Sequence, residues 1–261
     1  MNLRHLELED QPWFPKTIKE SMTDYLRFLF HTFKLYHPVN DYLINALDRC
    51  NSDRVIDLCS GSGGAIENVL TEVSKKYNKN ISFVLTDLYP RIEAYQYLAK
   101  KYGDRISFIH YPVDALNVPG FMNGFRTIFS GIHHFSPAEV KAVLQNSIKA
   151  KQGIAVFDGG NKNLFMILLI LVFHPLALAV FTPFIKPFRW SRLLFTYLIP
   201  VIPISSVWDG IISIINLYTP SQLLSIGKVA GESKFIWEAG KLKTKFGLSI
   251  SYLIGFPNAQ E

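Results

Sequence analysis

Strand-like and helix-like runs alternate along this 261-residue chain as far as residue 158. Short apolar runs bounded by turn residues predict strands, and apolar residues at spacings of three and four predict helices. Alternation of this kind is typical of a doubly wound, mostly parallel sheet, because parallel neighbours need a crossover between them. We expect strands at 54–59, 81–87, 106–111, 126–130 and 153–158, and helices at 16–35, 38–50, 64–77, 90–102 and 136–150.

The C-terminal part of the chain has a different pattern. Thr219-Pro220-Ser221-Gln222 forms a capping box that opens a predicted helix at 220–228. Two strand-like runs follow, at 233–239 and 248–255. We expect them to pair as an antiparallel hairpin and to complete a Rossmann-like α/β fold with a seven-stranded, mostly parallel sheet.

A glycine-rich segment follows the first predicted strand: Asp57-Leu58-Cys59-Ser60-Gly61-Ser62-Gly63-Gly64. Glycines permit positive φ and a close backbone approach to a ligand, and the next helix offers free amides. Such a loop could bind NAD, a phosphate or S-adenosylmethionine. Asp57 favours S-adenosylmethionine, because a carboxylate repels a pyrophosphate but suits an ammonium and a sulfonium. The G-x-G-x-x-G spacing of dinucleotide-binding loops is also absent.

Polar residues also follow the next three predicted strands. Asp87-Leu88 follows the second, Asp114-Ala115 the third and Ser130 to Phe135 the fourth. Open α/β sheets bind ligands at this edge, and an acid after the second strand can accept ribose hydroxyls. Asp114 is placed to meet an adenine amino group. We expect an adenosyl cofactor to be bound by Asp57, Ser60, Gly61, Gly63, Asp87, Leu88, Asp114, Ala115 and Ser130.

With these segments, residues 50–158 and 219–256 resemble the class I S-adenosylmethionine-dependent methyltransferases. Asp57 to Gly64 looks like their first motif, acidic-x-Gly-x-Gly-x-Gly, except that Cys59 stands in place of the first glycine. Asp87 is similar to their ribose-binding acid and Asp114 to their adenine-contacting acid. The resemblance implies methyl transfer from S-adenosylmethionine. It also implies that the N-terminal helix covers the cofactor.

Residues 159–208 contain no Asp or Glu. Leu164 to Ile185 is uncharged and has the length of a membrane span, which needs about 20 residues. Leu193 to Trp208 is a second uncharged run. The two runs could cross a bilayer as a hairpin, or they could enter one leaflet and return.

Charge and proline placement favour the second arrangement. A full hairpin would carry Arg189 and Arg192 across the bilayer, against the positive-inside tendency, and Pro175 interrupts the first run. We therefore expect a one-leaflet or surface-lying hairpin. Its cations and an aromatic residue would lie near the lipid headgroups: Lys162, Lys186, Arg189, Arg192 and Trp190.

These patterns divide the chain into an N-terminal helical cap (1–50), a cofactor-binding core (51–158), a membrane-associating insertion (159–208) and a C-terminal part of the core sheet (209–261). The net charge of +6 fits an anionic membrane surface, since long aliphatic runs disfavour nucleic-acid binding. The N-terminus lacks the apolar core of a signal peptide, so we expect the catalytic domain on the cytoplasmic side of a membrane. The histidines lack metal-ligand spacing, and we expect no metal.

Three residues are candidates for proton transfer. His133 and His134 follow the fourth predicted strand, and histidine is the commonest general base near neutral pH. Asp209 re-enters the domain after the insertion; its alternative role is that of a loop cap. Because the insertion follows the fifth strand, we expect a lipid or other hydrophobic acceptor. The alternatives are a catalytically inactive, membrane-anchored scaffold with this fold and a nucleotide-dependent oxidoreductase.

Overall fold

A computed structural model describes residues 6–77, 79–231 and 233–258. Within these residues, seven strands form one sheet in the order β3-β2-β1-β4-β5-β7-β6. Strands β1 to β5 are parallel, whereas β7 is antiparallel to both of its neighbours. The strands are β1 (Arg54–Leu58), β2 (Ser82–Leu85), β3 (Ile106–Phe108), β4 (Phe125–Phe129), β5 (Ile154–Gly159), β6 (Phe235–Lys243) and β7 (Ser249–Pro257).

This architecture confirms the predicted doubly wound sheet and its C-terminal hairpin. The chain winds outward from β1 to β3 and then restarts at β4, so the direction of winding switches between β1 and β4. Ligands bind at such a switch point, beyond the carboxyl ends of the strands. The glycine loop leaves β1 at this point and the histidine segment leaves β4 beside it.

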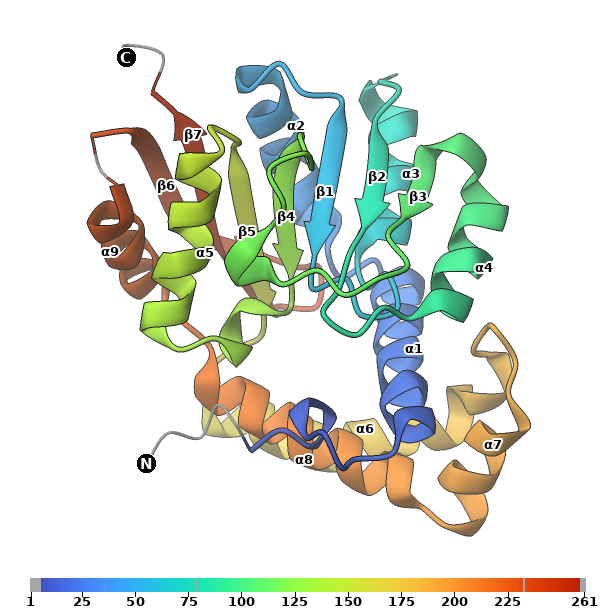
Figure 1. Cartoon of the computed structure of the whole chain (residues 1–261). Coiled ribbons are helices and arrows are strands. Elements are labelled where there is room, and N and C mark those ends of the chain that lie inside the picture. Colours follow the sequence, from blue (N-terminus) through green and yellow to red (C-terminus); the bar gives the residue numbers. More distant parts are fainter. Residues whose placement is uncertain (1–5, 78, 232, 259–261) are drawn as a thin grey trace.

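Helices cover both faces of the sheet (Figure 1). One face packs against α2 (Asn40–Arg49), α3 (Ile66–Tyr77) and α4 (Ile92–Tyr102), and the other against α5 (Pro137–Lys149) and α9 (Pro220–Gly231). The predicted capping boxes at the starts of α5 and α9 are present. Ser136 N donates to Glu139 Oε2 at 2.7 Å, and Thr219 N donates to Gln222 Oε1 at 2.9 Å.

The remaining helices form a separate layer below the carboxyl edge of the sheet. Figure 1 shows α6 and α8 side by side across that edge, with α1 running down from the sheet to meet them. Buried residues of α1, among them Ile18 and Tyr25, pack against Leu178 and Ile202 of the insertion. The layer comprises α1 (Lys16–Phe33), α6 (Leu164–Phe181), η6 (Thr182–Phe184), α7 (Trp190–Leu193), the π-helical η7 (Leu194–Leu198) and α8 (Val201–Asn216).

The helical layer departs from the predicted organisation in two respects. Helix α8 continues to Asn216 and so crosses the predicted boundary between 208 and 209. The expectation that Arg189 and Arg192 meet lipid headgroups is wrong. Arg192 is only 1% exposed and pairs with Asp24, while Arg189 pairs with Glu20 of α1 and Glu93 of α4. Because the insertion contains no acids, its buried cations require carboxylates from elsewhere in the fold.

Candidate active site

The glycine loop keeps a tight left-handed course between β1 and α3. Cys59 has φ +56°, so it adopts the left-handed conformation although it is not a glycine, and Gly61 has φ +53°. Gly63 has φ +95°, and a Cβ there would lie 2.2 Å from Leu98 Cδ1. Glycine is therefore required at position 63, while cysteine is accommodated at position 59.

Asp57 stabilises this loop from inside the protein. Its side chain is 2% exposed, and its carboxylate accepts hydrogen bonds from Ser60 Oγ at 2.6 Å and Thr127 Oγ1 at 2.7 Å. Burial raises the pKa of Asp57 to about 7, although both hydrogen bonds act in the opposite direction. The sequence places this carboxylate beside the ligand, whereas in the structure its contacts are with the loop and with β4.

Asp87 connects the glycine loop to the loop after β2. Its carboxylate accepts hydrogen bonds from Gly61 N and Tyr89 N, both at 2.8 Å, and its backbone carbonyl accepts one from Val113 N at 2.9 Å. The neighbouring Leu88 is exposed. These contacts join the loops that follow β1, β2 and β3 at one edge of the sheet, as the sequence predicts.

The last two predicted cofactor segments lie at the same edge. Asp114 is exposed and caps η4 (Ala115–Asn117) by accepting a hydrogen bond from Leu116 N at 2.9 Å. Ala115 is buried beneath it. Ser130 has φ +47°, and its hydroxyl is hydrogen-bonded to the Tyr36 hydroxyl. The structure thus places all the predicted cofactor segments along the carboxyl ends of β1 to β4.

His133 lies in η5 (Ile132–His134), directly beyond β4. Both oxygens of the Asp158 carboxylate, at the end of β5, lie 2.9 Å from His133 Nδ1. Burial lowers the pKa of His133, but Asp158 outweighs burial and the net pKa is raised. With Nδ1–H donating to Asp158, the lone pair of the imidazole is on Nε2. This arrangement orients His133 as a general base or as a ligand.

His134 faces acids of the N-terminal segment, which sequence reasoning missed. Its Nδ1 lies 2.8 Å from Asp10 Oδ2 and 3.4 Å from Glu7 Oε2, and its Nε2 lies 3.6 Å from Glu9 Oε1. Burial lowers the pKa of His134, but the carboxylates of Glu7 and Asp10 outweigh it, so the net pKa is well above the usual value. The signal in the sequence was a group of acids before the first helix.

Asp209 holds the N-terminal segment over this site. It lies within α8, and its carboxylate accepts hydrogen bonds from Leu8 N at 2.6 Å and Glu9 N at 3.0 Å, which begin η1 (Leu8–Asp10). Burial raises the pKa of Asp209 to about 8, with a further contribution from the charge of Glu9. Asp209 thus caps a distant segment and also lies beside the histidines.

A cavity of about 550 Å³ lies between the helical layer and the carboxyl edge of the sheet. Its polar end is formed by Ser130, His133, His134 and Asp209. Its walls are mostly apolar side chains of α1 and α6, including Met22, Leu26, Leu29, Phe165, Leu169 and Ile170. The residues of the glycine loop do not line it, so the cavity is separate from the predicted cofactor segments and adjoins them at Ser130.

The strand order, with β7 inserted antiparallel between β5 and β6, is that of the class I methyltransferases. The chain has the class I methyltransferase fold. No protein-family model matches the chain, and no curated protein matches it.

Several solved structures are similar to the chain at low identity. The pyocyanin biosynthetic protein PhzM is 14% identical over 85% of this chain and 54% of its own, with a TM-score of 0.49. Human N-acetylserotonin methyltransferase, solved with S-adenosylmethionine, is 13% identical over 93% of this chain and 58% of its own, with a TM-score of 0.49. The chain therefore spans little more than half the length of these proteins.

Proposed function

We propose that this chain is an S-adenosylmethionine-dependent methyltransferase that acts on a hydrophobic acceptor held in the cavity. One observation carries the proposal: an apolar cavity adjoins the predicted cofactor loops at Ser130, and the oriented imidazole of His133 lies where the two meet. The fold alone does not define an activity, which depends on the residues of the site.

The loops after β1 to β3 suit an adenosyl ligand. Asp87 Oδ1 and Oδ2 each accept one backbone hydrogen bond, which leaves further lone pairs for two ribose hydroxyls. Asp114 is exposed at the same edge and can accept a hydrogen bond from the adenine amino group. Gly61, Gly63 and Gly64 allow the backbone to approach the ligand closely.

When bound, S-adenosylmethionine supplies an electrophilic methyl group. The protein then has to position the acceptor and remove its proton. His133 Nε2 is suited to take the proton of an O–H or N–H acceptor, since Asp158 orients the ring and stabilises its charged form. A general base of this kind contributes roughly 10²–10⁴-fold to the rate. The apolar walls exclude water from the reacting atoms.

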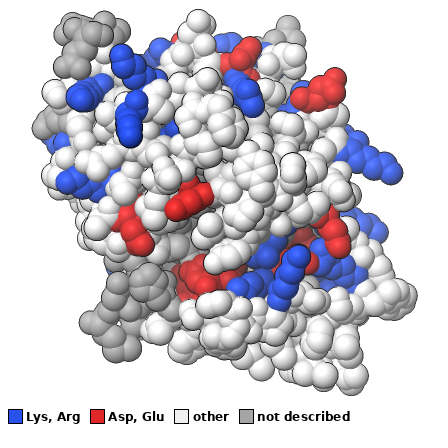
Figure 2. Space-filling model, in the orientation of Figure 1, with Lys and Arg blue, Asp and Glu red and all other residues white. Residues whose placement is uncertain are grey.

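The outer face of the helical layer supports an acceptor drawn from a membrane. Among the described residues, one helix, Leu164–Phe184, is long and apolar enough to cross a membrane, and 17% of an 18-residue apolar window within it is buried. The segments Trp190–Leu198 and Val201–Asn216 are bent by 81° relative to each other. Figure 2 shows few charged side chains on the lower part of the molecule, where α6 and α8 lie.

We infer from this surface that α6 and α8 lie in one leaflet of a bilayer. We also propose, from the sequence and not from this surface, that the catalytic domain lies on the cytoplasmic side. Large apolar side chains on the layer are at least half exposed, among them Leu168, Val172, Leu176, Trp190, Leu198 and Ile204. A group of large apolar side chains exposed together marks a contact surface. Helix α6 lines the cavity with Phe165 and Leu169 and exposes Leu168, so a lipid-soluble acceptor has a short path from bilayer to site.

Two measurements test the function. Calorimetry on the purified chain with S-adenosylmethionine and with NAD should show binding of the first only; binding of NAD alone would support an oxidoreductase. Incubation with a membrane lipid extract and methyl-labelled cofactor should then produce S-adenosylhomocysteine and label an extractable lipid. Cofactor binding without any methyl transfer would instead support the inactive scaffold. Transfer only to water-soluble acceptors would contradict the hydrophobic substrate.

A further inference from the structure

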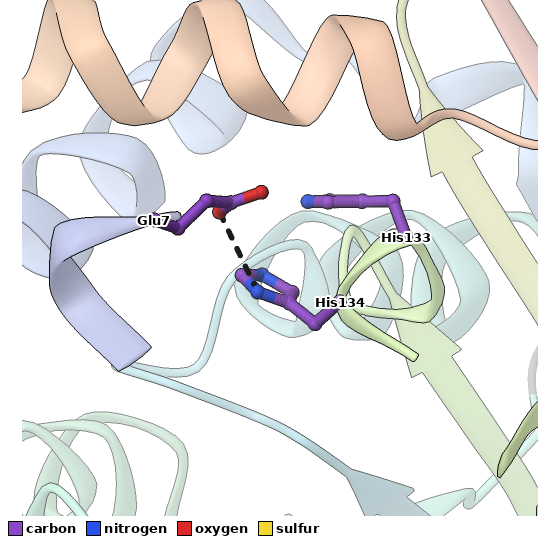
Figure 3. Close-up of side chains that lie close together, drawn as sticks. All are labelled: Glu7, His133 and His134. Atoms are coloured by element: carbon purple, nitrogen blue, oxygen red, sulfur yellow. Dashed lines mark ion pairs between the residues drawn. The ribbon is translucent and has the colours of Figure 1, made fainter. Parts of the chain in front are cut away.

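The N-terminal segment brings a third side chain to the two histidines. Glu7, His133 and His134 each offer one ligand atom, and these atoms all lie within 4.8 Å of one another. Figure 3 shows the Glu7 carboxylate and a ring nitrogen of His133 pointing toward each other, with His134 beside both. The histidines are adjacent in the sequence, but Glu7 reaches them only through the tertiary fold.

Glu7 is buried without the partner that a buried carboxylate needs. Its side chain is 0% exposed, and neither carboxylate oxygen has a hydrogen-bond partner among the described residues. Among the described residues, Glu7 forms one ion pair, between its Oε2 and His134 Nδ1, at 3.4 Å. Burying a carboxylate that has one long ion pair and no hydrogen bond is costly, and a bound cation removes that cost.

The surroundings of Glu7 add negative charge. Glu9 and Asp10 lie close to His134, and the Asp209 carboxylate binds the backbone between them. Lys19 and Arg91 act on Asp10 and Glu9 from a distance, but no lysine or arginine within the described ranges forms an ion pair with Glu7, Glu9 or Asp10. The cluster therefore attracts positive charge, which either protons on the imidazoles or one divalent cation can provide.

His133 is arranged as metal-binding histidines usually are. Its Nδ1 is 2.9 Å from the Asp158 carboxylate, which is buried, and a nitrogen of its ring points toward Glu7 (Figure 3). A carboxylate behind the imidazole fixes the tautomer and makes the other nitrogen a better ligand. Two imidazoles and one carboxylate form a common ligand set for zinc, with a fourth position left for water or substrate.

We propose that Glu7, His133 and His134 bind a divalent transition-metal ion of the zinc type at the polar end of the cavity. Both histidines line the cavity, so the open coordination position faces the acceptor. This proposal departs from the sequence-based expectation of no metal, which rested on the spacing of the histidines; one of the proposed ligands lies far away in the chain.

The role of the ion rests on the proposed function, although the binding site does not. A metal-bound hydroxyl or amine acceptor loses its proton more readily, which makes it a better nucleophile toward a methyl group. With both imidazoles acting as ligands, His133 is no longer free to act as the base. The acceptor proton is then released to solvent as the acceptor binds the ion.

Calorimetric titration of the EDTA-treated full chain with Zn²⁺ alone, without S-adenosylmethionine, tests the site. We expect one ion per chain and, with Glu7→Gln, affinity weaker by at least about 100-fold. Asp158→Asn should weaken binding by roughly 10–100-fold, as removal of a carboxylate behind a histidine ligand does. The matched control is Glu238→Gln, at an exposed acid on β6, which should bind like the unaltered chain.

Thermal unfolding supplies a second measurement. Zn²⁺ should raise the Tm of the unaltered chain and of Glu238→Gln but not that of Glu7→Gln, because only ions bound to the folded site stabilise it. A Tm for Glu7→Gln in EDTA at or above that of the unaltered chain verifies that the variant folds. Absence of Zn²⁺ binding to the unaltered chain, or unchanged binding by Glu7→Gln, would overturn the proposal. Since the titration contains no methyl donor, failure of cofactor binding would leave this result intact.

Discussion

The Asp24 carboxylate of α1 pairs with the Arg192 guanidinium of α7, and both side chains are 1% exposed. Arg192 also donates hydrogen bonds to the carbonyl oxygens of Ile185 at 3.0 Å and Pro187 at 3.1 Å. One guanidinium therefore closes the loop between α6 and α7 and attaches it to the N-terminal helix. The insertion and the cap form a single layer as a result.

We predict that Arg192→Met destabilises the chain by about 3–5 kcal/mol, because it leaves the buried Asp24 with only its longer ion pair to Arg189, at 3.9 Å. Adding Asp24→Asn to that variant should recover part of the loss. Urea unfolding followed by circular dichroism measures both effects. Lys16→Met, which removes an exposed pair with Glu20 on the same helix, should cost less than about 1 kcal/mol. Equal losses in Arg192→Met and Lys16→Met would contradict this account of the pair.

Asp87→Ala should weaken S-adenosylmethionine binding by at least roughly 100-fold. The reason is that two hydrogen bonds from ribose hydroxyls to a carboxylate are worth about 1.5–3 kcal/mol each. Asp87→Asn retains one acceptor oxygen, so its affinity for S-adenosylmethionine should lie between those of the unaltered chain and Asp87→Ala. Calorimetry measures the affinities, and Asp104→Ala, at an exposed acid in η3 (Gly103–Arg105), is the control. An unchanged affinity in a folded Asp87→Ala chain would rule out the ribose assignment.

The buried Asp57 predicts a pH dependence of stability. Its pKa is about 7 in the folded chain, against 3.8 as the ordinary value. Between these values the unfolded chain binds fewer protons than the folded chain, so this residue lowers the free energy of unfolding as pH rises from about 4 to about 7. Each pKa unit corresponds to about 1.4 kcal/mol.

Asp57→Asn cannot ionise and should lose this dependence. Urea unfolding of both chains from pH 4 to pH 8 should therefore show the variant gaining stability relative to the unaltered chain as pH rises. Parallel pH profiles would show that the Asp57 carboxyl does not titrate in this range.

Leu169→Trp should narrow the cavity and raise the KM for a bulky hydrophobic acceptor by about tenfold or more, while leaving S-adenosylmethionine affinity unchanged. Leu169 lines the cavity, whereas Leu168 on the same helix is 52% exposed. Leu168→Trp is therefore the matched control. Kinetics with a series of acceptors of increasing chain length measure the effect. A similar response to both substitutions would place the acceptor outside the cavity.

Replacing Leu168 and Val172 together with Glu should reduce binding to lipid vesicles by at least tenfold. The two carboxylates would have to enter the acyl region with the apolar face of α6, which is strongly unfavourable. Cosedimentation with vesicles containing anionic lipid measures the bound fraction. Val229→Glu alters an equally exposed apolar residue on α9, outside the helical layer, and should bind normally. Loss of binding in that control instead would move the contact surface to α9.

Local sequence patterns were enough to predict the sheet and the loops around it. Alternating runs reproduced the seven strands, and Ser136 and Thr219 began their helices as their capping boxes predicted. The ends of strands were less accurate: β3 stops at Phe108, short of the predicted 111. Residues that continue an apolar pattern leave the ladder when the neighbouring strand ends, and that depends on pairing rather than on periodicity.

The sequence by itself determined which chemical groups gather at the carboxyl edge, because the end of each parallel strand lies there whatever the rest of the chain does. Only the tertiary structure decided which charges meet. Arg192 pairs with Asp24, and His134 pairs with Glu7, although the partners lie far apart in the chain. The apolar pattern of a helix predicts which of its faces is buried. It does not predict the partner of a buried charge, because that partner depends on how distant segments pack. A partner is needed because an unpaired charge is too costly to bury.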